Sequence, residues 1–167
     1  IIPVPAGENL SAISIGMLKQ SRDQVIAWRG PILDRAIQQF LADVYWGDLD
    51  FLLVDLPPGT GDVAMSLGAK LPNAEVIAVT TPQQPAAEVA ERAGTMASKV
   101  EQKVLGVVEN MAYLDAECPH CGQTHRVDLF GSGGGAKVAE ALTLRLGYDV
   151  PLLAEEPIDA RMSASGD

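Results

Sequence analysis

The sequence has few basic residues, few aromatic residues and no long apolar run. Lys and Arg number 12 against 22 Asp and Glu, for a formal net charge of -10, so the chain as a whole repels nucleic acid and anionic membranes. No run approaches the roughly 18 to 20 apolar residues of a membrane-spanning helix, and no basic segment followed by an apolar one resembles a secretory signal. We therefore expect a cytoplasmic protein that has neither nucleic acid nor a membrane as partner.

Cysteine is also scarce, which excludes the disulfide framework of a small secreted domain. The two cysteines, Cys118 and Cys121, are separated by two residues, and one such pair supplies half of a tetrahedral metal site or of an iron-sulfur cluster. A second chain could complete a cluster, or His120 or His125 could complete a zinc site. A thioredoxin-like redox pair is disfavoured because the residues after Cys121 make a poor helix start. The spacing favours metal, although either histidine alone is more typical of an ordinary loop.

No G-x4-G-K-S/T phosphate-binding loop occurs in the chain. Residues 131–138 (GSGGGAKV) satisfy the weak pattern G-x-G-x-x-A, but Ala136 stands where a Walker A motif has its last glycine, and Val138 replaces the Ser or Thr that binds Mg2+. This segment is more typical of a flexible loop that leads into a helix.

The segment 51–62 (FLLVDLPPGTGD) carries the clearest chemical signal. Its four apolar residues, 51–54, predict a strand buried on both faces of a parallel sheet. Asp55 would then lie at the carboxyl end of this strand, where a carboxylate can hold Mg2+. Gly59 and Gly61 would let backbone N–H groups approach a γ-phosphate, and Asp62 would cap a helix that begins near residue 63. The alternative is an ordinary strand, turn and helix cap.

Strands and helices alternate along the rest of the chain. We expect strands at about 75–80, 104–108 and 150–153, an extended stretch near 12–18, and helices at about 32–44, 63–71, 85–100 and 135–146. This order predicts an α/β fold with a mostly parallel sheet and helices on both faces. We expect a single domain over residues 1–167, with the cysteine loop at about 112–130.

Seven segments in order resemble one known family. They are 28–31 (WRGP), 38–41 (QQFL), 55–62 (DLPPGTGD), 79–83 (VTTPQ), 105–111 (LGVVENM), 118–121 (CPHC) and 130–135 (FGSGGG). They closely resemble the Mrp/ApbC family of iron-sulfur cluster carrier ATPases, which belong to the MinD-like, deviant-Walker-A branch of the P-loop NTPases. The resemblance covers nearly the whole chain. Residues 28–31 are part of this family signature, but their residue types indicate no particular chemical role.

The resemblance implies a role for each matching position. Asp55 is similar to the family's Walker-B Asp, and Asn110 to the residue that hydrogen-bonds the adenine edge. Cys118 and Cys121 resemble the pair that, with its copy from a second subunit, holds a labile 4Fe-4S cluster. The second switch loop, which senses the γ-phosphate, corresponds to Gly59, Thr60, Gly61 and Asp62.

The implied function is an iron-sulfur carrier ATPase that uses ATP and Mg2+, forms a homodimer and transfers its cluster to apo-proteins. The family's first strand and glycine-rich loop have no counterpart in the chain, so we expect them before residue 1 and expect this chain alone neither to bind nor to hydrolyse ATP detectably. Two other classes stay open: a MinD/ParA-like positioning ATPase, and a zinc-stabilised binding module that needs no nucleotide.

Overall fold

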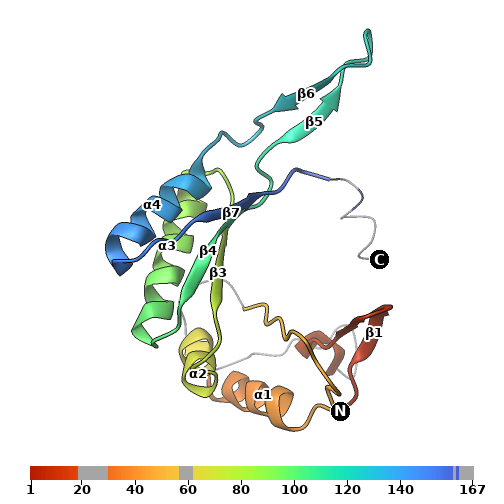
Figure 1. Ribbon diagram of the computed structural model, residues 1–167. Helices are drawn as coiled ribbons and strands as arrows, with labels where there is room; N and C mark the ends of the chain where they lie inside the picture. The colour runs from red at the N-terminus through yellow and green to blue at the C-terminus, as the bar shows by residue number, and fades with distance from the viewer. Residues whose placement is uncertain (19–29, 57–61, 160, 162–167) are drawn as a thin grey trace. The chain divides into compact units, whose positions relative to one another are not determined.

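The computed structural model describes residues 1–18, 30–56, 62–159 and 161 (Figure 1). Two compact units make up the chain, Ile1–Pro58 and Gly59–Asp167, and each is described by itself. The single domain expected from the sequence stays a prediction. Trp28 and Arg29 of the family signature lie outside the described residues.

The first unit contains a small hairpin and one long helix. Its elements are β1 (Val4–Gly7), β2 (Leu10–Ala12), the 3-10 helix η1 (Ile15–Leu18) and α1 (Gly30–Ala42), with β1 and β2 antiparallel. The chain after α1 is tied to the first residue: the Ile1 backbone nitrogen donates to the Asp43 carbonyl at 2.8 Å, and the Tyr45 N–H donates to the Ile1 carbonyl at 2.8 Å. The predicted helix is confirmed, whereas the extended stretch near 12–18 is wrong because η1 occupies most of it.

The strand predicted at residues 51–54 is also wrong. Residues 51–56 have no regular secondary structure, and Phe51 and Leu53 are 84% and 86% exposed. A strand forms only where a neighbouring backbone pairs with it, and no strand of the described residues does so here. The apolar run is real, but a sequence reports side-chain polarity and not the presence of a partner strand.

The second unit is built on a three-stranded parallel sheet in the order β3-β4-β7. Its strands are β3 (Val76–Thr80), β4 (Val104–Glu109) and β7 (Leu152–Glu155), and its helices are α2 (Asp62–Lys70), α3 (Gln84–Lys99) and α4 (Gly134–Leu146). The predicted helices and these three strands are confirmed within about two residues. The α/β class with a parallel sheet is therefore confirmed.

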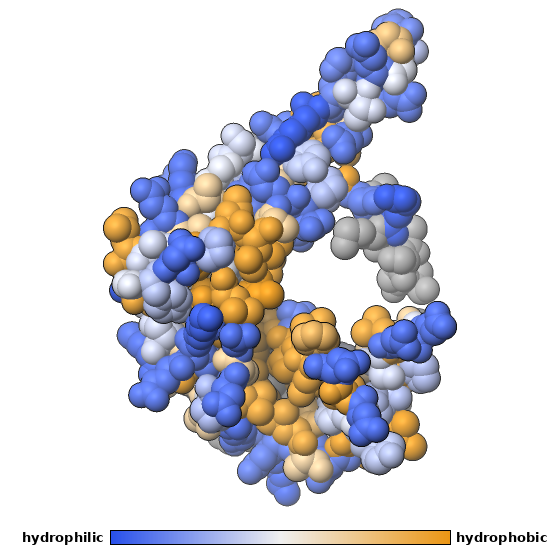
Figure 2. Space-filling view, viewed as in Figure 1, coloured by the Kyte–Doolittle hydropathy of each residue, from blue (hydrophilic) through white to orange (hydrophobic). Residues whose placement is uncertain are grey.

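One face of this sheet forms the core of the unit. α3 and α4 pack against each other and against the strands, and the buried side chains that they share with the sheet include Val104, Val107 and Leu142. On the other face Ile77, Val79 and Leu153 are exposed, and Figure 2 shows hydrophobic surface over this part of the unit. Both crossovers step in the same direction across the sheet, so right-handed connections put both helices on the same face. Helices on a second face stay a prediction.

An antiparallel hairpin projects from the α/β layers (Figure 1). It consists of β5 (Leu114–Glu117) and β6 (Thr124–Val127), and it is inserted between β4 and α4. We call residues 112–130 the cysteine arm. The sequence predicts only a loop here, because each strand of the hairpin has four residues, which is too short for the alternation of polar and apolar residues to stand out.

No helix of the described residues has the length and apolar character needed to cross a membrane.

The start of α4 is packed directly on backbone. A Cβ added at Gly134 would lie 2.6 Å from the Pro82 carbonyl oxygen and 2.8 Å from the Pro82 Cα. The residue before it, Gly133, is the helix N-cap with a φ of 74°, a conformation that glycine adopts without strain. The glycine-rich segment is therefore a close-packed helix start.

Gly134→Ala should lower the free energy of unfolding by about 1–3 kcal/mol, because the backbone of Pro82 cannot move aside as a flexible side chain would. Urea unfolding measures this change. Gly16→Ala is the matched control, since its added Cβ would meet only the Ser14 Oγ at an ordinary 3.5 Å. Equal stability of Gly134→Ala and the unaltered chain would contradict the packing described here.

Candidate functional site

The carboxyl ends of β3 and β4 form one edge of the sheet. Thr80 pairs with Glu109 in the parallel register, and the Asn110 N–H donates to the Thr80 carbonyl at 2.8 Å. Asn110 is thus half-buried at the edge where open α/β sheets bind ligands. Its Oδ1 accepts a hydrogen bond from the Met111 N–H at 2.9 Å, so this side chain shapes the turn that follows. Its contact with adenine stays a prediction.

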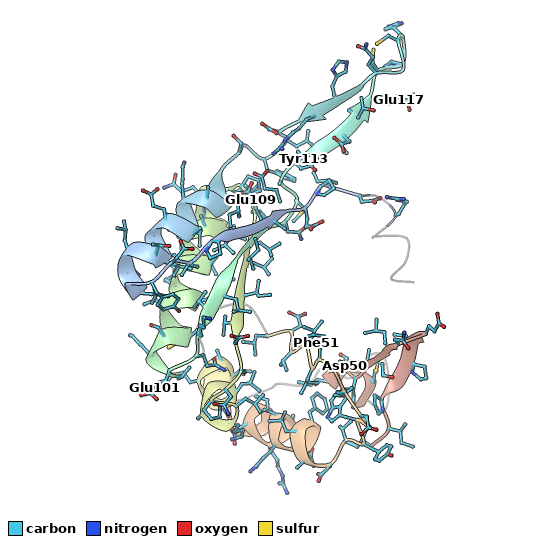
Figure 3. The ribbon with its side chains drawn as sticks, viewed as in Figure 1. Asp50, Phe51, Glu101, Glu109, Tyr113 and Glu117 are labelled. Carbon is cyan, nitrogen blue, oxygen red and sulfur yellow. The ribbon has the colours of Figure 1, made fainter. Side chains whose placement is uncertain are left out.

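Glu109 is a buried acid that the sequence analysis did not single out. The side chain is fully buried; its Oε2 accepts a hydrogen bond from the Gly135 N–H, and its Oε1 has no hydrogen-bond partner among the described residues. A carboxylate at the N-terminus of α4 also meets the positive end of the helix dipole. Figure 3 shows Glu109 where β4 and α4 meet. The sequence feature that could have identified Glu109 is its position as an acid at the end of an otherwise apolar strand.

The base of the cysteine arm is held by Arg126. Its guanidinium lies 4.0 Å from the centre of the Tyr113 ring, and its Nη2 lies 3.5 Å from Glu155 Oε2 on β7. Its Nε donates to Asp128 Oδ1 at 3.3 Å. All of these groups are partly exposed, so each contact contributes modestly. Together they tie β6 to β5 and to the edge strand of the sheet.

The two cysteines lie at the far end of the arm, beyond the β5 residue Glu117 that Figure 3 labels. The Cys118 N–H donates to the Gln123 carbonyl at 2.8 Å, and the Gly122 N–H donates to the Cys118 carbonyl at 2.9 Å. Gly122 closes this turn with a φ of 69°. Both thiols are free; Cys118 is half-buried and Cys121 is exposed. The turn therefore presents both sulfurs at an accessible tip.

Hydrogen bonds at this tip favour the thiolate form of Cys118. The His120 N–H lowers the pKa of Cys118 most, followed by the N–H and the thiol of Cys121, while partial burial opposes them weakly. The thiolate is the form that binds metal. The local backbone thus prepares Cys118 to act as a ligand.

His125 joins the two cysteines in space. The ligand atoms of Cys118, Cys121 and His125 all lie within 4.8 Å of one another. His120, the other histidine considered from the sequence, does not belong to this group. The tip therefore offers two thiolates and one imidazole from a single chain.

The structure describes only some of the residues that the sequence predicted for the nucleotide site. Asp55 is exposed and belongs to the first unit, whereas Asn110 and the cysteines belong to the second. Asp62 is the first residue of α2. Gly59, Thr60 and Gly61 lie outside the described residues. The roles of all these residues stay predictions.

The whole chain, residues 1–167, matches the model of a family described as NUBPL iron-transfer P-loop NTPase. The chain belongs to this family. This membership confirms the resemblance drawn from the seven sequence segments, and it confirms the P-loop NTPase fold class.

Curated proteins resemble the chain over nearly all of its length. An iron-sulfur cluster carrier protein of Mycobacterium tuberculosis is 54% identical over 100% of the chain and 42% of its own length. One from Pyrococcus furiosus is 41% identical over 95% of the chain and 50% of its own length. The chain therefore spans half or less of these curated relatives.

A solved structure supports the same assignment. A nucleotide-binding protein of Archaeoglobus fulgidus, in complex with ADP and with cobalt present, is 35% identical and superposes with a TM-score of 0.69. The match covers 98% of the chain and 59% of that protein.

Glu109→Ala should destabilise the junction of β4 and α4, because it leaves the buried Gly135 N–H without an acceptor at a cost of about 1–3 kcal/mol. Hydrogen exchange at the Gly135 amide should speed up correspondingly. Glu109→Gln keeps an acceptor oxygen and should preserve most of the protection, and Glu117→Ala, at an exposed position, should change nothing at Gly135. Unaltered exchange at Gly135 in Glu109→Ala would show that the carboxylate does not anchor α4.

Proposed function

We propose that the whole protein carries a labile 4Fe-4S cluster between two copies of the chain and transfers it to apo-proteins in an ATP-linked way. The observation that carries the proposal is the pair Cys118 and Cys121, presented as free thiols at the tip of a projecting arm. The family is one of iron transfer, and the curated relatives are iron-sulfur cluster carrier proteins.

The donor set of the arm suits a cluster shared with a second copy of the chain. A cluster is commonly held by four thiolates, and residues 1–167 supply two. The hydrophilic surface of the arm (Figure 2) leaves its tip in water, where a second tip can approach. A labile cargo suits such a place, because ligands at an exposed turn can be exchanged for those of a recipient apo-protein.

Nucleotide binding would use the residues that the family resemblance assigns to it. Asp55 would hold Mg2+ directly or through water, and Asn110 would hydrogen-bond the adenine edge. The loop 59–62 would sense the γ-phosphate, as the switch loops of P-loop NTPases do. This part of the proposal is supported by the ADP complex of the Archaeoglobus fulgidus relative.

The position of α2 suggests how nucleotide could influence the rest of the second unit. The switch loop leads directly into α2, and the Gln102 side chain donates to the Leu71 carbonyl at the end of α2 at 3.2 Å. Gln102 precedes β4, and the arm follows β4. A shift of α2 on ATP binding would thus move β4 and with it the arm, so that cluster exposure would depend on the nucleotide.

We place the protein in the cytoplasm, whose reducing conditions keep both thiols free.

Cys118→Ser should abolish cluster retention by the full-length protein and leave its ATP binding largely intact, because none of the residues proposed to bind nucleotide belongs to the arm. The measurement is anaerobic reconstitution with iron and sulfide, with iron and sulfide counted per chain. The unaltered protein should hold about two irons and two sulfides per chain.

Asp115→Asn is the matched control, since Asp115 is exposed on the same arm but on the other face of β5. It should keep the cluster. Loss of ATP binding together with the cluster in Cys118→Ser would instead indicate a structural metal, and so would stoichiometric zinc that resists replacement by iron.

A further inference from the structure

We propose that Cys118, Cys121 and His125 form a second, mononuclear site within one chain, which holds a single divalent ion of the Zn2+ type. The inference rests on the proposed function only in that the same two sulfurs would serve the shared cluster. It starts from the three ligand atoms that lie within 4.8 Å of one another at the tip of the arm.

The strand register explains why these side chains meet. His125 pairs with Ala116 across the antiparallel hairpin, and side chains directly opposite each other lie on the same face. Cys118 is two residues beyond Ala116, so it lies on that face as well. The hydrogen bond from the Cys118 N–H to the Gln123 carbonyl continues the ladder, which holds Cys118 and His125 in a fixed diagonal relation.

The two acidic residues of β5, Asp115 and Glu117, are placed on its other face by the same register. Asp115 pairs with Arg126, and Glu117 pairs with Thr124. Because side chains alternate between the two faces along a strand, both acids lie on the face opposite to Cys118 and His125. The group of ligand atoms at the tip therefore consists of soft sulfur and imidazole donors, which Zn2+ prefers, and among the described residues it includes none of the carboxylates that suit Mg2+ or Ca2+.

The spacing fits one tetrahedral ion after a small contraction. With Zn–S of about 2.3 Å and Zn–N of about 2.0–2.1 Å, the ligand atoms around one ion lie about 3.5–3.8 Å apart. Closing the trio from within 4.8 Å to that separation needs a movement of about 1 Å. Binding releases the thiol protons, and two thiolates with one neutral imidazole balance the charge of the ion. Water or an outside ligand would take the fourth position.

The shared sulfurs make the two metal forms mutually exclusive. An ion held by both thiolates of one chain leaves none for a cluster between two chains. Zn2+ should therefore oppose cluster assembly, and His125 should strengthen that opposition because it contributes to the mononuclear site alone. His125 would set how readily the carrier exchanges an ion for a cluster.

The test is an anaerobic titration of the full-length, cluster-free protein with Co2+, whose tetrahedral ligand-field bands and sulfur charge-transfer band report the ligands. The unaltered protein should bind about one Co2+ per chain with two thiolates, and Zn2+ should displace it. His125→Ala should weaken Co2+ binding by at least about tenfold, since losing even an outer-shell partner costs about 10–100-fold. His120→Ala, the matched control in the same turn, should bind like the unaltered protein.

His125→Cys separates a ligand from a structural residue. It keeps a soft donor at this position and should restore tight Co2+ binding with a stronger charge-transfer band. Equal affinity of His125→Ala and the unaltered protein would overturn the inference. So would one Co2+ shared by two chains through four thiolates, or equal weakening in His125→Ala and His125→Cys.

Reconstitution of the same proteins with iron and sulfide distinguishes this inference from the proposed function. His125→Ala should still assemble the cluster and should need more Zn2+ than the unaltered protein to block it. A protein that assembles the cluster but binds no Co2+ through His125 refutes the mononuclear site alone. One that binds Co2+ through His125 but never assembles a cluster refutes the carrier function alone.

Discussion

The buried carboxylate of Glu109 is the constraint on which the cysteine arm depends. It closes β4, and its Oε2 accepts the Gly135 N–H at the start of α4. The arm leaves the sheet just after Glu109 and returns just before Gly135, so this one contact joins the two ends of the insertion. A Cβ added at Gly135 would lie 2.8 Å from the Glu109 Cβ, which explains why the helix start is glycine-rich without being a phosphate-binding loop. The arm can thus project far into solvent from a fixed base.

Most of the second unit could be predicted from the sequence, because its helices and strands carry their own periodic signal. The runs that became β3 and β4 are short, apolar and bounded by turn residues, and α3 and α4 are amphipathic. The run at 51–54 has the same composition as those strands, yet its side chains are exposed and no strand of the described residues pairs with it. Pairing is a property of the neighbouring chain, so the pattern of a single segment cannot report it.

The ligands of the candidate site could be located from the sequence where chemistry follows from spacing, whereas the choice between the two histidines depends on strand register. The C-x2-C pair and Asn110 at a strand end could both be located from the sequence, although their roles in binding stay predictions. The sequence left His120 and His125 as alternatives beside the cysteines, and the pairing of Ala116 with His125 decides for His125. We expected a loop over residues 112–130, so this register could not be predicted from the sequence. Glu109 was missed for a similar reason: the neighbour that makes it important, Gly135, is distant in the sequence.

The central claim is that the cysteine arms of two chains share one cluster. Native mass spectrometry of the full-length protein after anaerobic reconstitution tests it most directly, because it weighs the assembly and its inorganic content together. The account predicts a dimer that carries the mass of one 4Fe-4S cluster and that falls back to cluster-free chains in the Cys121→Ser variant. A cluster of any size on a single chain, or a dimer that keeps its cluster without Cys121, would contradict it.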